Sequence, residues 1–124
     1  MSKSQSRTPL KITVEGVGET TGELVRFLAP LTVETLLKIL PIEGRAHSQA
    51  GGVSFILGIR RGGEKSTRDV EAGTIAYWPM QDAVCIYYED TRTYSPVNRI
   101  GKVTGDPGIF RGLKSGAKIR IEAA

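Results

Sequence analysis

The sequence predicts a mainly β protein that folds as a closed barrel of about eight short strands with one or two capping helices. Three observations predict this class: short runs of alternating apolar and polar residues recur, 15 glycines separate them, and a single segment has helical periodicity. The 124 residues suffice for one hydrophobic core and leave no room for a second. We therefore expect one domain over residues 9–124, preceded by a flexible tail over residues 1–8.

The strands are predicted from period-two alternation bounded by glycine, proline or polar turns. The first is the most regular, because Leu10, Ile12 and Val14 alternate with polar side chains. The runs 74–78 and 83–88 flank a short polar turn, and we expect these two strands to be central. The predicted strands are residues 10–14, 23–28, 46–49, 53–59, 74–78, 83–88, 100–103 and 117–121.

One helix is predicted early in the chain. Thr32 is the expected N-cap of a helix that ends at residue 40, before Pro41. Residues 107–113 are expected to add one or two helical turns, and residues 60–68 form a polar loop. The apolar face of the predicted helix, at the i, i+3, i+4, i+7 spacing, consists of Val33, Leu36, Leu37 and Leu40.

Composition excludes several classes of site. With one cysteine, Cys85, and one histidine, His47, the chain has neither an intrachain disulfide nor a Cys/His zinc site. The acidic residues lack the spacing of a calcium loop, so no metal is expected. The glycines at positions 16, 18 and 22 precede a strand rather than a helix, which indicates turn chemistry instead of a dinucleotide cofactor. No cofactor is predicted.

The formal net charge of +4 resides in the C-terminal part of the chain. From Arg92 onward there are seven basic and two acidic residues. These basic residues are dispersed, and neither a basic helix nor an RNA-binding strand of aromatic and basic residues accompanies them, so a solvated cationic face is favoured over a nucleic-acid site. No apolar run is long enough to cross a bilayer, and the first ten residues are polar, so a cytoplasmic protein without a membrane partner is expected.

Two segments carry a family resemblance. They are Gly-Thr-Ile-Ala-Tyr-Trp-Pro at residues 73–79 and Ser-Pro-Val-Asn at residues 95–98. The chain resembles, over roughly residues 10–122, the prokaryotic cyclophilin-like family of small proteins of unknown function. The resemblance implies a closed β-barrel of the cyclophilin type, in agreement with the strand pattern.

The resemblance extends in part to the prolyl-isomerase motifs of cyclophilins. Residues 49–55 and 100–103 are similar to two of these motifs, but the Phe-His-Arg motif is missing, and Val97 stands where a histidine is expected. Arg45 and His47 have the right residue types in a different order. Isomerisation requires stabilisation of a rotated amide, which a guanidinium in an apolar pocket can provide. Arg45 is therefore the candidate catalytic residue of a weak isomerase.

The aromatic residues predict a binding cleft. Tyr77, Trp78, Tyr87, Tyr88 and Tyr94 lie within one stretch, where about half of the side chains on alternating strands must be core. The remainder can line a groove for an apolar side chain, a proline ring or a flat ligand. The candidate ligand-binding residues are His47, Gln49, Phe55, Tyr77, Trp78 and Tyr87.

Three functions remain open from the sequence. The first is a module that binds a peptide segment or small apolar ligand without covalent chemistry. The second is a weak peptidyl-prolyl isomerase that uses Arg45. The third is a nucleic-acid-associated protein that uses its basic C-terminal part. A homodimer is compatible with all three, because the sequence does not reveal which strand forms the sheet edge.

Overall fold

The computed structural model describes residues 6–124, so most of the tail expected over residues 1–8 lies outside the described residues. Arg7 and Thr8 belong to the first strand. The described chain is mainly β, as predicted, with one α-helix and two short 3-10 helices. The elements are β1 (Arg7–Val14), β2 (Gly18–Val25), η1 (Arg26–Leu28), α1 (Pro30–Ile39), β3 (Ile42–Arg45), β4 (His47–Gln49), β5 (Gly52–Ile56), β6 (Thr67–Val70), β7 (Thr74–Trp78), β8 (Ala83–Tyr87), β9 (Thr91–Val103), η2 (Pro107–Phe110) and β10 (Lys118–Ala123).

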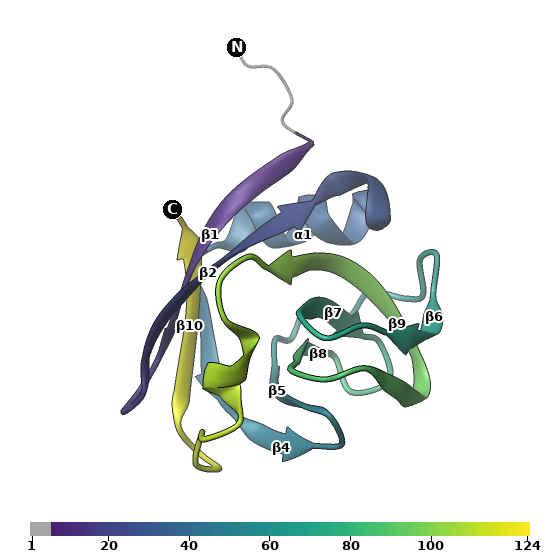
Figure 1. The fold of residues 1–124 in the computed structure, drawn as a ribbon. Helices are drawn as coiled ribbons and strands as arrows, with labels where there is room; N and C mark the ends of the chain where they lie inside the picture. The colour runs from purple at the N-terminus through teal and green to yellow at the C-terminus, as the bar shows by residue number, and fades with distance from the viewer. Residues whose placement is uncertain (1–5) are drawn as a thin grey trace.

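The strands form one curled sheet with α1 lying across one end, as Figure 1 shows. The strand order is β3-β10-β1-β2-β9-β7-β8-β5-β4, and β6 pairs with β9 outside this path. Strands β7 and β8 lie inside the sheet, as predicted. The expectation of a closed barrel of about eight strands is wrong in two respects, because the described residues contain ten strands and the ladder does not close.

The sheet stays open because of the short connection between β3 and β4. At Ala46 the backbone bonds to the segment before β10, since its N–H donates to the carbonyl of Ala117 and its carbonyl accepts from Gly116. Strand β3 therefore follows β10, while β4 pairs with β5. Strands β3 and β5 approach through side chains instead, because Phe55 packs against Gly44 so closely that a Cβ atom there would lie 2.7 Å from the ring.

The principal core lies inside the curled sheet. Alternate residues of β1, β7, β8 and β10 point into it, and Ile119 and Ile121 are buried while Lys118 is exposed, as predicted. Helix α1 contributes Val33 and Leu36 to this core. The helical face predicted from sequence spacing is therefore confirmed, with Leu37 and Leu40 partly buried at its margin.

A second, smaller apolar layer lies on the outer face of β7 and β8. Strand β9 is 13 residues long. Its second half pairs with β2 and β7, while its first half pairs with β6. The outward-facing residues of β8 beneath this layer are buried as well as the inward-facing ones, so every residue of β8 has little exposure. This outer cluster consists of Val70, Ala76, Cys85, Tyr87 and Val97, with Trp78 packed against it.

The start of α1 differs from the prediction. The helix begins at Pro30, and the N-cap position is Ala29, whose side chain forms no cap. The carboxylate of Glu64, from the loop before β6, supplies the missing acceptor: it accepts from the backbone N–H groups of Leu31 and Thr32 at 2.9 and 2.8 Å. Thr32 is thus inside the first turn, and its hydroxyl also donates to Glu64. No helix in the described part of the chain is long and apolar enough to span a bilayer.

Candidate functional site: an aromatic pocket on the outer face

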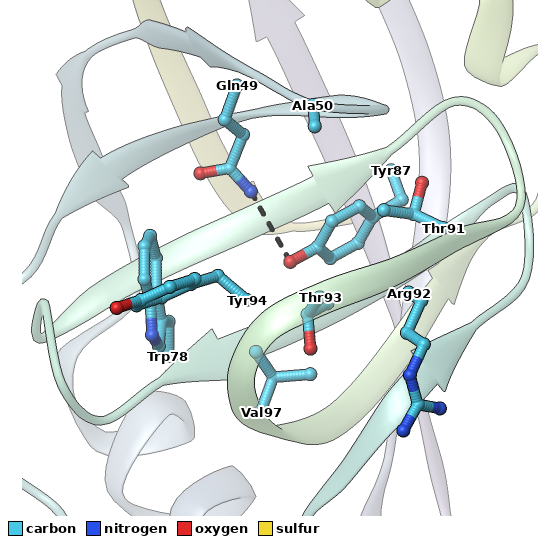
Figure 2. Close-up of a pocket in the computed structure, with 9 residues that line it drawn as sticks. All are labelled: Gln49, Ala50, Trp78, Tyr87, Thr91, Arg92, Thr93, Tyr94 and Val97. Atoms are coloured by element: carbon cyan, nitrogen blue, oxygen red, sulfur yellow. Dashed lines mark hydrogen bonds between the residues drawn. The ribbon is translucent and has the colours of Figure 1, made fainter.

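A pocket lies where the first half of β9 passes the tip of the β4–β5 hairpin (Figure 2). Strand β4 contributes Gln49, strand β7 contributes Trp78 and strand β8 contributes Tyr87. We call this cavity the aromatic pocket. It is lined by Gln49, Ala50, Trp78, Tyr87, Thr91, Arg92, Thr93, Tyr94 and Val97.

The walls of the aromatic pocket are mainly apolar. Tyr87 and Val97 are almost fully buried and belong to the outer cluster. Trp78 is partly exposed, and its indole N–H donates to the hydroxyl of Ser95, which orients the ring. Tyr94 is 84% exposed. An exposed tyrosine at the mouth of an apolar pocket offers a large contact surface to a ligand at little entropic cost.

A few polar groups face this pocket. The side-chain amide of Gln49 donates to the hydroxyl of Tyr87 at 3.3 Å (Figure 2). The hydroxyl of Thr93 donates to the carbonyl of Ser95, and that of Thr91 to the carbonyl of Glu89. Gln49 therefore keeps an amide oxygen that no described group binds, and it is the polar group best placed to orient an amide-bearing ligand.

Burial keeps the two acidic side-chain groups beside Gln49 protonated. Desolvation raises the pKa of the Cys85 thiol to about 11. Burial, together with the neighbouring Cys85, also raises the pKa of Tyr87 above its ordinary value. Neither group supplies a nucleophile or base at neutral pH. The pocket lining contains no carboxylate and no imidazole, and within residues 6–124 no cluster of His, Cys, Asp and Glu is arranged to hold a metal ion.

The structure brings together three of the residues predicted for a site and separates the others. Gln49, Trp78 and Tyr87 line the aromatic pocket. Phe55 and Tyr77 point the other way, into the principal core, because they alternate with outward-facing neighbours on β5 and β7.

Two predicted site residues lie outside the pocket. His47 is exposed on β4 and is not part of the lining. Arg45 is exposed on β3, and its guanidinium donates to the carbonyl of Gly116 at 2.9 Å. It is therefore directed toward the β10 side of the sheet, and the pocket's only guanidinium is that of Arg92.

Sequence reasoning missed the wall made by residues 91–97. This segment has a period-two pattern of its own, Thr-x-Thr-x-Ser-x-Val. The buried members Thr93 and Ser95 are polar, so the pattern carries no hydrophobic signal. The cluster of aromatic residues in sequence did include Tyr94, which marks the rim.

A family model described as Cyclophilin-like matches residues 8–122. The chain belongs to the cyclophilin-like family. This cyclophilin-like chain is also similar to the solution structure of the hypothetical protein AF2241 from Archaeoglobus fulgidus, with a TM-score of 0.81, 27% identity and complete coverage of both chains. A structure of McbB in complex with tryptophan matches with a TM-score of 0.77 and 17% identity. That match covers 92% of this chain but 44% of McbB, and at this identity it shows the fold alone. No curated protein sequence matches the chain.

Proposed function

We propose that this cyclophilin-like protein binds a peptide segment through one ring or compact apolar side chain held in the aromatic pocket, without covalent chemistry. The observation that carries the proposal is the pocket itself, a cavity with apolar walls of Trp78, Tyr87 and Val97 and the amide of Gln49 at its side. A recognition site for an apolar group next to a peptide bond needs this combination of groups.

The size of the aromatic pocket selects the ligand. Its volume is about 130 Å³, whereas sites for drug-sized molecules measure roughly 300–1,000 Å³. An engineered apolar cavity of about 150 Å³ accommodates benzene. The pocket therefore suits one proline, phenylalanine or leucine side chain, with the rest of the ligand outside. The McbB complex, in which a protein of the same fold holds tryptophan, makes that amino acid a reasonable further probe.

The chemistry of the lining supports binding rather than bond making. The hydroxyls of Thr91 and Thr93 are already donors to backbone carbonyls. A hydroxyl nucleophile requires an adjacent base, and the lining supplies none. The buried thiol and phenol nearby remain protonated because burial raises their pKa values.

Trp78 provides a direct test, because it is the only tryptophan in the chain and lines the pocket. We would titrate the protein with N-acetyl-prolinamide, N-acetyl-phenylalaninamide and N-acetyl-lysinamide while following the indole fluorescence, and with tryptophan by calorimetry. The first two should shift the emission in a saturable way, and the lysine derivative should not. If none of the apolar probes binds at millimolar concentration, the proposed function is wrong.

A matched pair of variants ties the signal to the pocket. Tyr94→Ala removes the exposed aromatic ring at the rim, and Phe27→Ala removes one that is 56% exposed in η1. The first change should weaken binding by roughly 3- to 10-fold, while the second should leave it unchanged. Equal losses in both variants would place the binding elsewhere.

Weak prolyl isomerisation is a second candidate, favoured by one observation. The guanidinium of Arg92 borders the aromatic pocket, although its Nη1 atom is paired with Asp69 at 2.8 Å. If this arginine turned toward a bound proline, it would be the donor to the rotated imide, in place of Arg45. A protease-coupled assay on X-Pro peptides should then lose its catalysed rate in Arg92→Gln and keep it in Arg45→Gln. Absence of any catalysed rate in the unmodified protein would remove this candidate.

A further inference from the structure

We propose that the peptide recognised by this protein is acidic on one side of its apolar anchor, and that this acidic portion lies along a second groove bordered by arginines that form no ion pair among the described residues. The inference rests on the proposed function, because it assigns the flanking residues of the ligand whose anchor enters the aromatic pocket.

The second groove adjoins the aromatic pocket. Its volume is about 340 Å³, and it is wider and shallower than the pocket. We call it the Met80 groove; it is lined by Gly63, Ser66, Pro79, Met80, Ser95 and Pro96. Met80 is 66% exposed. A flexible methionine between two prolines offers apolar contact that adapts to different side chains.

The two hollows share a wall. Trp78 lines the pocket, and the next residue, Pro79, lines the groove. On β9, Tyr94 lines the pocket, and the next residue, Ser95, lines the groove. The hydrogen bond from Trp78 to Ser95 closes this wall. Successive residues of an extended chain are about 3.3 Å apart, so a ligand anchored beside Trp78 reaches the Met80 groove within two or three residues.

Ion pairs divide the cations of the protein into two groups. Five of the seven basic residues from Arg92 onward pair with carboxylates, which reduces the cationic character of that part of the chain. They are Arg92 with Asp69, Lys102 with Glu23, Arg111 with Glu89, and Lys118 and Arg120 with Glu43. The C-terminal nucleic-acid site considered from the sequence is therefore not favoured.

The second group of cations lies on the segments that line the Met80 groove and forms no ion pair within residues 6–124. Two belong to the loop 57–66, which supplies Gly63 and Ser66 to the groove, one lies on β6 and one on β9. These residues, which we call the cationic border, are Arg60, Arg61, Arg68 and Arg99. The guanidinium of Arg68 donates to the carbonyl of Thr93 on β9, whereas Lys65 is not part of the border because its ammonium donates to the carbonyl of Phe27. Arg99 pairs with Ala76 of β7 in the ladder, so its side chain lies on the same face of the sheet as that of Ala76. This is the outer face, which also carries the aromatic pocket.

The carboxylates near this border offset it only in part. Glu64 accepts from the start of α1, and Asp82 accepts from the backbone N–H groups of Ile59 and Arg60. The positive charge of Arg61 helps to lower the pKa of Glu64, and that of Arg60 helps to lower the pKa of Asp82, but neither carboxylate forms an ion pair among the described residues. The border thus keeps net positive charge, and complementary charge on a ligand lowers the free energy of its encounter and binding.

An acidic peptide fits these features better than a nucleic acid. The groove floor is made of prolines and a methionine, and the adjoining pocket encloses a single small ring. A single-stranded nucleic acid requires aromatic faces at successive base positions along a cationic track, and within the described residues only Tyr94 is a highly exposed aromatic ring beside these hollows.

The test uses three blocked hexapeptides that share one phenylalanine anchor and differ in the flanking residues, which are acidic (Asp/Glu), neutral (Ser/Gln) or basic (Lys). Affinities are measured through Trp78 fluorescence at low and at physiological ionic strength. We expect the acidic peptide to bind roughly 3- to 10-fold more tightly than the neutral one at low salt. This preference should shrink as salt is added, and the basic peptide should bind most weakly.

Two matched substitutions locate the effect. Arg99→Gln and Lys114→Gln each remove one exposed cation that forms no ion pair among the described residues, the first at the border and the second in the segment after η2. Arg99→Gln should reduce the preference for the acidic peptide by roughly twofold or more, and Lys114→Gln should leave it intact. Met80→Ser should weaken all three hexapeptides while leaving N-acetyl-phenylalaninamide unaffected.

The outcomes separate this inference from the proposed function. If no peptide perturbs Trp78, both are wrong. If the three peptides bind equally, or if Lys114→Gln acts like Arg99→Gln, the pocket binds its anchor but the acidic flank is refuted. If a single-stranded oligonucleotide of similar length binds more tightly than the acidic peptide, the occupant of the border is a nucleic acid and the inference is overturned.

Discussion

The side-chain amide oxygen of Asn98 accepts a hydrogen bond from the backbone N–H of Glu64 at 2.8 Å, and Glu64 in turn caps helix α1. Asn98 is fully buried on β9. Its amide also donates to the carbonyl of Gly62 and accepts from the hydroxyl of Ser66. One residue of β9 therefore holds both the loop beside the Met80 groove and, through Glu64, the start of the helix.

We expect Asn98→Ala to lower the free energy of unfolding by about 2–4 kcal/mol, because it leaves several buried polar groups without partners. Urea unfolding followed by circular dichroism measures this loss. The exposed change Ser48→Ala on β4 is the control and should cost less than about 0.5 kcal/mol. A small effect of Asn98→Ala would mean that water replaces the amide.

Stability should fall at acid pH through Glu64 and Asp82. Burial raises the pKa of Glu64, but the hydrogen bonds from Leu31 and Thr32 outweigh it and leave the pKa below its usual value. For Asp82, burial is likewise outweighed by hydrogen bonds from Tyr77 and from two backbone N–H groups. Because both folded-state pKa values are lowered, their stabilisation is complete above the unfolded pKa values, about 4. It is lost as the pH falls through the lower folded values.

Measuring the free energy of unfolding between pH 7 and pH 2.5 tests this expectation. Glu64→Gln and Asp82→Asn should each be less stable than the unmodified protein at pH 7 and approach it at low pH. Glu71→Gln changes an exposed carboxylate that forms no hydrogen bond among the described side chains, and it serves as the control. A difference that stays constant with pH in the Glu64 and Asp82 variants would contradict the assignment.

Gly101 is required by a close approach of two backbones. A Cβ atom there would lie 2.0 Å from the carbonyl oxygen of Glu23, a distance no side-chain carbon tolerates. The contact belongs to the short β2–β9 ladder, which joins the β3-β10-β1-β2 half of the sheet to the remaining strands. Gly101→Ala should therefore cost at least about 2 kcal/mol or prevent folding. Gly112→Ala, where nothing lies within 4 Å, should have little effect on the thermal midpoint.

Gln49 is expected to recognise the amide of a ligand rather than its ring. Gln49→Ala should weaken N-acetyl-prolinamide by roughly fivefold, the equivalent of about 1 kcal/mol for one hydrogen bond. Binding of a ring without an amide, such as toluene, should change little, because the apolar walls remain. Calorimetry with both probes measures the difference. If Gln49→Ala weakens the binding of toluene as much as that of N-acetyl-prolinamide, Gln49 acts by shaping the cavity.

Much of the fold could be predicted because hydrophobic alternation reports which face of a strand is buried. The strands at residues 74–78 and 83–87 and the apolar face of α1 were predicted from this signal. The first half of β9 was missed because its buried positions include the polar residues Thr93 and Ser95, which form hydrogen bonds within the protein. The β6 strand was missed because Val70 is its one buried residue, which is too little for a period-two pattern. The opening of the sheet depends on backbone bonds at Ala46, which no sequence pattern reveals.

The candidate site was predictable only in part. The aromatic residues in one stretch indicated a cleft, but alternation alone could not decide which ring faces the core. Tyr77 faces inward, where its hydroxyl donates to Asp82 at 2.6 Å, while Tyr87 faces outward. The Ser-Pro-Val-Asn run carries part of the family resemblance. Its asparagine, Asn98, forms hydrogen bonds with Gly62, Glu64 and Ser66 and so holds this loop in place.

Strand β9 runs without a turn from the rim of the aromatic pocket into the ladder with β2 and β7. Its residues 91–97 form a wall that also pairs with β6, so a lid-like movement of this wall would break ladder hydrogen bonds. Ligand entry then depends on rotamer changes of side chains such as Tyr94, which take place in picoseconds to nanoseconds. Occupancy also stabilises the whole molecule, since a ligand that binds only the native state raises its melting temperature with concentration. The thermal midpoint of this protein should thus serve as a direct gauge of what its pocket accepts.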